Sequence, residues 1–306
     1  MRKKSIFTNM LFVTLAALLC CALWGSATPF IKIGYELLLP EKNVPSTILF
    51  AGIRFTMAGI ITILIYSIGR RKFIFPQKEN WDKVAKIAAV QTVIQYIFFY
   101  IGLANTTGAK GTIISGSDVF SSLLIAALLY KQEKLTPKKV IGCLVGFCGI
   151  ILVNLDGLDF KMNFMGDCFV LFSAISYSFS SVFVKKFSQY EDPVILSGYQ
   201  FLLGGIFMII VGLIFGGVVT ISGGAALAVL IYLSFLSAIA YALWGILLKH
   251  NPVSRVSIFS FTKPVFGVLL SAILLNEQSG VSVMNLIISL VLVCAGILIL
   301  NIKKED

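Results

Sequence analysis

The sequence predicts an all-α polytopic membrane protein, with ten transmembrane helices arranged as two inverted five-helix repeats. Composition is the first reason: 58% of the 306 residues are hydrophobic and 13% are charged, whereas a soluble domain carries about 25% charged residues. The second reason is that apolar segments, mostly near the length of about 20 residues that crosses a bilayer, alternate with short polar loops. The third is that the first five segments resemble the last five in order.

Ten spans are expected, with boundaries taken from the ends of the apolar runs. They lie at residues 10–33, 46–69, 83–104, 108–130, 137–155, 164–186, 194–216, 223–247, 252–276 and 281–302. Each must be a helix or a strand of a closed barrel, because lipid cannot satisfy open backbone groups. Barrel strands alternate polar and apolar residues, and runs such as 286–293 do not. We therefore predict helices.

Proline marks where several of these helices begin. A proline precedes or opens four spans, where its missing N–H costs nothing: Pro45, Pro137, Pro193 and Pro252. Pro29 and Pro264 lie deeper within their spans and are predicted to kink or break the helix. In transporters, irregular backbone at such depth lines a cavity.

The loop charges predict the orientation. Nineteen of the 25 Lys and Arg residues lie in every second loop or at the termini, at residues 2–4, 70–86, 131–139, 185–186, 249–255 and 303–304. The positive-inside rule then puts both termini in the cytoplasm of a multi-pass protein of the plasma (inner) membrane. It also inverts the second five spans relative to the first, with domains at 1–156 and 157–306. The net charge of +11 follows from these loops, and no nucleic-acid partner is expected.

The two halves can be aligned at their fourth spans. Leu128-Leu129-Tyr130-Lys131-Gln132-Glu133 resembles Ile273-Leu274-Leu275-Asn276-Glu277, so corresponding residues lie 144 positions apart. An inverted repeat within a membrane is typical of a transporter.

Charged residues within spans are the first candidates for a substrate site. A charge at the bilayer centre costs about 2.5–3.5 kcal/mol on insertion scales, so it usually faces a cavity or a partner. Lys263 lies deep in the ninth span, and the offset of 144 places Asp118 next to it. The two side chains either line a central site and bind substrate or pair with each other and hold helices together. Arg54 either binds a carboxylate or phosphate group or holds helices together.

Polar and aromatic residues at helical spacing are weaker candidates. Gln95 follows Gln91 by four residues, Tyr177 shares a helix face with three serines, and Tyr241 lies on another such stripe. These stripes either line a wet path or join helices by hydrogen bonds. Trp24 either shapes the substrate site or serves as an interfacial anchor or packing residue. The predicted substrate-binding set is Asp118, Lys263, Trp24, Gln95, Tyr177, Tyr241 and Arg54.

Enzymatic chemistry is not expected. The six cysteines all fall within apolar segments and show no metal-ligand spacing, and the one histidine, His250, lies at a predicted cytoplasmic turn. No Gly-rich phosphate loop or nucleophile pair is present, so we predict no catalytic residues, no cofactor and no metal. An intramembrane enzyme would need catalytic groups paired at one depth.

The chain resembles the EamA-type transporters of the drug/metabolite transporter (DMT) superfamily over essentially its whole length. The resemblance rests on residues 22–26 with Lys32, 53–55, 131–136 with Gly142 and Gly149, 263–266 and 275–277. Asn276 stands where the family usually has glycine. The resemblance implies ten helices, a central cavity between the halves and alternating access, with substrates that range from amino acids to drugs.

We therefore expect a secondary transporter, most simply an exporter, of a small polar metabolite such as an amino acid. The alternatives are an anionic metabolite, a drug-like compound, or a membrane protein that does not transport. Without a nucleotide site a gradient must drive transport, and Asp118 is the candidate for a coupling proton. The small-residue face of Gly142 and Gly146 suits close packing, including a homodimer.

Overall fold

The computed structural model describes residues 6–106, 108–153, 155, 163–275 and 283–301. This part of the chain is helical and contains no β-strand. Nine of its helical stretches are long and apolar enough to cross a membrane. A tenth apolar helix, α7 (Pro137–Val153), has 17 residues, which is the lower limit of about 17 for a spanning helix. The predicted all-α polytopic membrane protein is confirmed.

The helices follow the predicted spans closely. In the first half they are η1 (Ile6–Thr8), α1 (Met10–Leu38), α2 (Val44–Arg70), η2 (Lys78–Asn80), α3 (Trp81–Ile87), η3 (Ala88–Ile94), α4 (Gln95–Ala104), α5 (Gly108–Ser115), α6 (Asp118–Leu124), η4 (Ile125–Leu129) and α7. In the second half they are η6 (Phe164–Cys168), α8 (Phe169–Phe187), α9 (Pro193–Ile214), α10 (Gly224–His250), α11 (Val253–Ser257), η7 (Ile258–Phe261), α12 (Thr262–Leu275) and α13 (Val283–Asn301). The predicted domain boundary at 156/157 lies outside the described residues.

Local sequence explains where the helices begin. The side chain of Asn43 accepts a hydrogen bond from the backbone N–H of Ser46 at the start of α2, and that of Asp192 accepts one from Val194 at the start of α9. Both caps satisfy an N–H group that has no partner within the helix. Pro45 and Pro193 occupy the first turns of these helices, as predicted.

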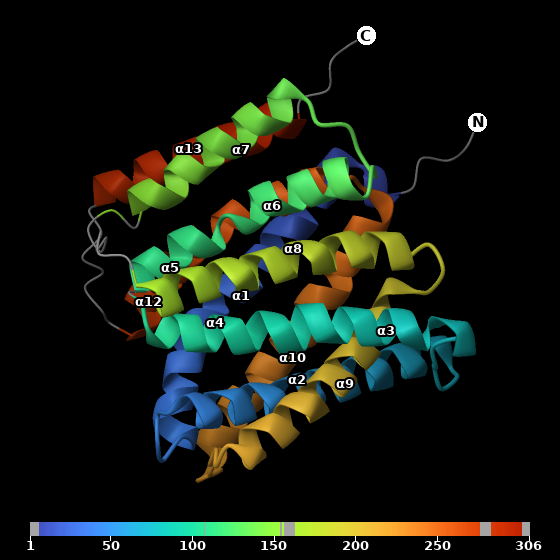
Figure 1. Cartoon of the computed structure of the whole chain (residues 1–306), viewed down its shortest axis with the longest axis vertical. Coiled ribbons are helices and arrows are strands. Elements are labelled where there is room, and N and C mark those ends of the chain that lie inside the picture. Colours follow the sequence, from blue (N-terminus) through green and yellow to red (C-terminus); the bar gives the residue numbers. More distant parts are fainter. Residues whose placement is uncertain (1–5, 107, 154, 156–162, 276–282, 302–306) are drawn as a thin grey trace.

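Equivalent helices of the two halves make equivalent packing contacts. The second and seventh spans, α2 and α9, form one pair, and the fifth and tenth, α7 and α13, form another. The first span, α1, packs against α10 and α12 of the second half, and the sixth span, α8, packs against α4 and α6 of the first. The pattern is unchanged when each span is exchanged for its counterpart. The two pairs lie at opposite edges of the bundle (Figure 1).

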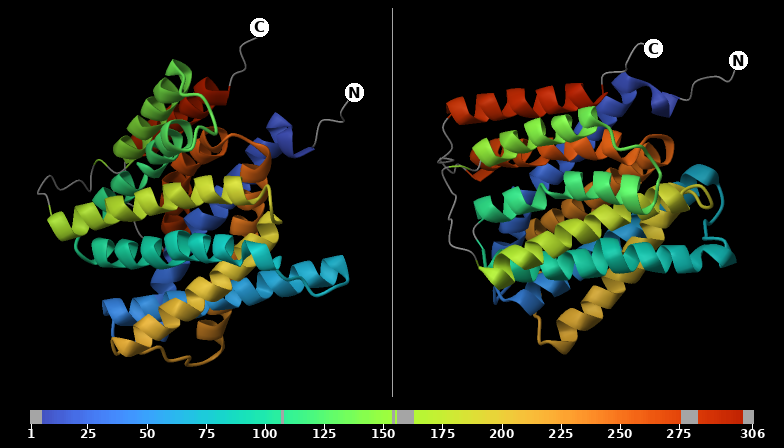
Figure 2. Two further views of the ribbon diagram at one scale, coloured as in Figure 1. Left: turned by 45° about the vertical axis from the view of Figure 1, so that its right-hand side comes forward. Right: turned by 45° about the horizontal axis from the view of Figure 1, so that its top comes forward.

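Small residues set how closely these pairs approach. A Cβ atom at Gly59 of α2 would lie 2.7 Å from the carbonyl oxygen of Gly198 in α9. A Cβ at Gly142 of α7 would lie 2.9 Å from the carbonyl oxygen of Gly296 in α13. Backbones can come this near only where side chains are absent. The predicted small-residue face of α7 is thus covered by α13 of the same chain, side by side with it in both views (Figure 2).

Two spans are interrupted: the fourth, which was expected to be continuous, and the ninth, in which Pro264 was predicted to kink or break the helix. Gly116 and Ser117 separate α5 from α6, and the tight 3-10 turn η7 separates α11 from α12. Adding the offset of 144 to residues 116 and 117 gives 260 and 261, so both interruptions occupy the same place in the repeat. Gly116 and Ser117 weaken the helix of the fourth span locally. In the ninth span, Pro264 has no backbone N–H and cannot donate a helical hydrogen bond.

Pro29 has less effect than predicted. Helix α1 runs without interruption from Met10 to Leu38 with Pro29 inside it. Neighbouring helices can compensate for the one hydrogen bond that a proline removes from a membrane helix. The two interruptions of the spans therefore lie in the fourth and ninth spans, immediately before the helices α6 and α12 that carry Asp118 and Lys263.

Candidate functional site

Asp118 and Lys263 form an ion pair within the helix bundle. The Lys263 Nζ atom lies 3.2 Å from Oδ2 of Asp118. The Lys263 side chain is 27% exposed and the Asp118 side chain is 8% exposed. Each residue belongs to the first turn of the helix that follows its interruption, α12 and α6. The two broken spans thus bring an acid from one half of the chain to a base from the other.

Two aromatic rings complete the surroundings of the Lys263 ammonium. Its Nζ atom lies 5.3 Å from the ring centre of Trp24 on α1 and 5.0 Å from that of Tyr177 on α8. A cation is attracted to the face of an aromatic ring at such distances. Four helices, α1, α6, α8 and α12, therefore meet around one positive charge.

Further rings extend from Trp24 towards α2. The ring centres of Trp24 and Tyr241 lie 5.1 Å apart, and the hydroxyl of Tyr241 is 2.8 Å from that of Tyr96. Tyr96 lies 4.5 Å from Phe55 between ring centres. The guanidinium carbon of Arg54 lies 4.4 Å from the Phe55 ring centre. A continuous row of aromatic contacts thus connects Lys263 with Arg54.

The seven predicted site residues separate into two groups. Lys263 contacts Trp24, Asp118 and Tyr177, and Tyr241 adjoins Trp24. Arg54, which is 3% exposed, and Gln95, next to Tyr96, belong to the far end of the aromatic row. Among the described residues, no hydrogen bond or ion pair joins either of them to Asp118 or Lys263.

A glycine allows α1 to approach α12 at this site. A Cβ atom at Gly25 would lie 2.5 Å from Cβ of Phe266 and 2.9 Å from the backbone nitrogen of Gly267. This close approach brings α1, and with it the preceding residue Trp24, to the helix that carries Lys263. The sequence Ala-Leu-Trp-Gly at 22–25 therefore combines a ring for the site with the space that brings it there.

Side chains also hold the interrupted backbone in place. The hydroxyl of Ser178 on α8 donates to the carbonyl oxygen of Asp118 at 2.9 Å. The carbonyl oxygen of Phe259, in the tight turn before α12, accepts from the Thr262 hydroxyl at 2.7 Å and from the Cys21 thiol at 3.2 Å. These bonds satisfy backbone groups that a regular helix would use, so the positions of Asp118 and Lys263 are fixed from α8 and α1.

Several buried polar atoms at the site lack a hydrogen-bond partner among the described protein atoms. They are Nε1 of Trp24, Oε1 of Gln95, Oδ1 of Asp118, Oη of Tyr177 and Nε1 of Trp244. Most buried polar groups in proteins are satisfied, so each exception needs an explanation. Along the aromatic row, Trp24 and Trp244 supply donors and Asp118 and Gln95 supply acceptors, a mixture that suits a polar ligand.

Tyr96 and Trp244 also adjoin the site, although neither is in the substrate-binding set predicted from the sequence. Tyr96 bonds to Tyr241, and the ring centre of Trp244 lies 4.9 Å from that of Trp24. A signal for Trp244 was present: Ala-Leu-Trp-Gly recurs at residues 242–245. The two copies belong to α1 and α10, which pack against each other.

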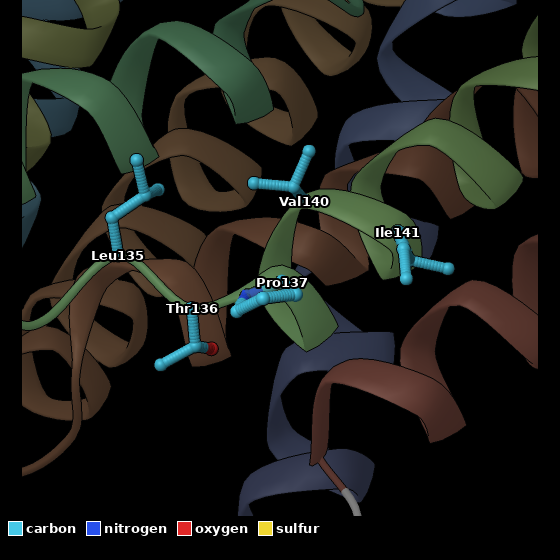
Figure 3. Close-up of a pocket in the computed structure, with 5 residues that line it drawn as sticks. All are labelled: Leu135, Thr136, Pro137, Val140 and Ile141. Atoms are coloured by element: carbon cyan, nitrogen blue, oxygen red, sulfur yellow. The ribbon is translucent and has the colours of Figure 1, made fainter.

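In the described part of the chain, no three His, Cys, Asp or Glu side chains come together in a way that could hold a metal ion. A shallow apolar depression of about 370 Å³ lies at the start of α7, lined by Leu135, Thr136, Pro137, Val140 and Ile141 (Figure 3). It contains no charged residue and no member of the site.

Glu133, after the fourth span, joins the two halves at the predicted cytoplasmic end. Its Oε1 atom accepts from the backbone N–H of Ser254 at 2.9 Å, and its Oε2 accepts from the Ser254 hydroxyl. The Lys139 ammonium lies 2.5 Å from Oε2. Ser254 is in the first turn of α11, so Glu133 caps a helix of the other half.

Comparisons with known proteins agree with this architecture. The uncharacterized transporter YvbV of Bacillus subtilis is 25% identical to the chain over 287 residues, which are 92% of this chain and 89% of YvbV. An uncharacterized transporter of Archaeoglobus fulgidus is 26% identical over 84% of this chain and 86% of its own. A WAT1-related chloroplastic protein of Arabidopsis thaliana is 24% identical over 82% of this chain, which spans 63% of that longer protein.

A solved crystal structure shares the fold, with a TM-score of 0.79, 18% identity and coverage of 96% of this chain and 97% of the other. The sequence model of the EamA-like transporter family matches twice, at residues 11–155 and 164–302. The two matches together cover nearly the whole chain. The protein therefore belongs to the EamA-like transporter family, within the drug/metabolite transporter superfamily, and is a multi-pass membrane transporter.

Proposed function

We propose that the protein is a secondary transporter that exports a small polar metabolite, such as an amino acid, by alternating access. The observation that carries this proposal is the Asp118–Lys263 pair between two interrupted helices, surrounded by Trp24, Tyr177 and Tyr241. A buried ion pair usually stabilises a protein no more than apolar residues of similar volume. Its presence is therefore better explained by a ligand than by stability.

The chemistry of the site suits a substrate with both charges. Asp118 uses one carboxylate oxygen for Lys263, and the other, Oδ1, is buried and has no hydrogen-bond partner among the described atoms. A substrate ammonium can bind Oδ1 and the aromatic faces, and a substrate carboxylate can bind a cation of the site. Interrupted helices near mid-membrane form such sites in many secondary transporters.

Transport by purified protein in liposomes is the direct test. We expect labelled amino acids to exchange across the liposome membrane in proportion to the protein incorporated, and Lys263→Met to abolish exchange. Lys72→Gln, which removes an exposed cation outside the spans, is the matched control and should exchange normally. A panel of amino acids, organic anions and drug-like cations in which none is exchanged would contradict the proposal and favour a membrane protein that does not transport.

A proton gradient is the proposed driving force, with Asp118 as the coupling residue. We expect an imposed pH gradient to accumulate substrate in liposomes containing the unaltered protein. The Asp118→Asn variant should still exchange substrate at equilibrium but lose accumulation, because an amide cannot carry the proton. Gradient dependence that is unchanged in Asp118→Asn would contradict this role.

The proposed setting is the plasma (inner) membrane, with both termini cytoplasmic. The homodimer suggested by the small residues of α7 needs another surface, because α13 covers that face.

A further inference from the structure

Arg54 is a buried cation that meets no carboxylate among the residues that the structure describes. It lies inside the α2 span, and the residue is 3% exposed. No hydrogen bond or ion pair joins it to any described residue, and its Nε atom is buried without a partner. The other cation deep in the described spans, Lys263, is paired with Asp118.

The groups around Arg54 are aromatic and uncharged. The guanidinium lies over the ring of Phe55, which shares one buried cluster with Tyr100 and Tyr241, against which Tyr35 packs. Neutral hydroxyls can accept a hydrogen bond, but they cannot cancel a full charge. Because Asp118 and Lys263 cancel each other, the described residues of this region carry one net positive charge.

We infer that Arg54 binds the carboxylate of a monocarboxylate substrate whose other end carries a hydrogen-bond donor. This inference rests on the proposed transport function and specifies its substrate class. A guanidinium forms two parallel hydrogen bonds to a planar carboxylate. A single uncompensated charge matches a monoanion, whereas a phosphate dianion would leave a net negative charge in a buried site.

The geometry orients such a substrate along the aromatic row. Its carboxylate lies at Arg54, its body lies against Tyr96, Tyr241 and Trp24, and its donor faces the unpartnered Oδ1 of Asp118. Amines without a carboxylate and neutral amides lack the group that Arg54 requires.

The first test needs no substrate. If Arg54 is retained for an anion, replacing it by a neutral side chain removes an uncompensated buried charge. Arg54→Met should then raise the thermal unfolding temperature of the purified protein in detergent. A helix-holding arginine behaves in the opposite way, and a lowered unfolding temperature in both Arg54→Met and Arg54→Gln overturns the inference.

The second test uses sodium propionate as the probe, against sodium chloride at equal ionic strength. Propionate should raise the unfolding temperature of the unaltered protein to a saturating limit. Arg54→Lys should weaken the apparent affinity by about tenfold to a hundredfold through loss of the bidentate contact, and Arg54→Met should abolish saturation. Lys72→Gln should respond like the unaltered protein. Propionate saturation that persists in Arg54→Met, or is absent from the unaltered protein, overturns the inference.

The two proposals fail in different ways. Saturable, Arg54-dependent propionate binding in a protein that moves no solute across liposomes would refute transport and leave the carboxylate site. Robust transport that is equally fast in Arg54→Met would refute the carboxylate site and leave transport.

Discussion

At the scale of single residues, the site is defined by charged side chains within the spans, where an unpaired charge is energetically costly. Asp118 and Lys263 offset each other across the two halves, whereas Arg54 does not meet a described carboxylate. Breaking a buried pair costs more than removing it, because one charge is left uncompensated. The three residues can therefore be separated by how their substitution changes stability.

The ion pair is expected to show strong coupling in a double-mutant cycle. Asp118→Asn alone should lower the free energy of unfolding by about 3 kcal/mol, the low end for breaking a buried pair, because Lys263 keeps 27% of its exposure. Asp118→Asn combined with Lys263→Met should recover most of that loss. Unfolding in detergent micelles measures both, and additive losses would show that the pair does not act as a unit.

At the scale of elements, two interrupted helices and one close helix contact create the site. The interruptions place Asp118 and Lys263 in first turns, and Gly25 lets α1 reach α12. The repeat predicted that the two charged residues lie close together. It did not predict the interruption at Gly116 and Ser117, because isolated glycines are common in membrane helices and usually leave them continuous.

Gly25→Ala should separate α1 from α12. The added Cβ would lie 2.5 Å from Cβ of Phe266, so we expect a loss of about 1–3 kcal/mol in unfolding free energy, as for other overpacked sites, together with weaker substrate binding. Gly69→Ala is the control, since nothing lies within 4 Å of its Cβ position in α2; alanine there should be neutral or stabilise by up to about 1 kcal/mol. Equal effects of both substitutions would contradict this account of the contact.

Glu133 is expected to hold the predicted cytoplasmic ends of the fourth and ninth spans together. Glu133→Gln weakens its contacts with Ser254 and Lys139, which should increase opening on that side. The measurement is the labelling rate, by a membrane-impermeant maleimide, of a cysteine introduced at Ser257, which is buried beyond Ser254. Glu79→Gln, at an exposed carboxylate, should leave the rate unchanged. Equal rates in the Glu133→Gln variant and the parent would show that this contact does not restrain opening.

At the scale of the whole molecule, the protein is a helix bundle in which the same contacts recur when each span is replaced by its counterpart in the other half. Helix α1 begins and α13 ends on the same side of the bundle (Figure 1). The spans α2 and α9 and the spans α7 and α13 connect the halves at opposite edges. The central helices between these edges carry all the charges of the site except that of Arg54.

The predicted orientation can be tested with reporters fused to each end of the chain. The loop charges predict that both termini are cytoplasmic, so a cytoplasmic fluorescent reporter should be active at either terminus. An alkaline phosphatase that requires an extracytoplasmic environment should be inactive at both. Opposite results at the two ends would mean an odd number of spans and would refute the inverted arrangement.

The sequence by itself determined the helical class, the order of the spans and the approach of Asp118 to Lys263. It could do so because a bilayer permits few backbone structures, and because a repeat relates distant residues by a fixed offset. Only the tertiary structure decided that Lys263 is paired with Asp118 while Arg54 meets no described carboxylate, and that Tyr96 and Trp244 complete the aromatic row. Pairing and burial depend on how α1, α2, α4 and α10 pack, and no pattern along a single helix specifies which of its faces meets a residue on another.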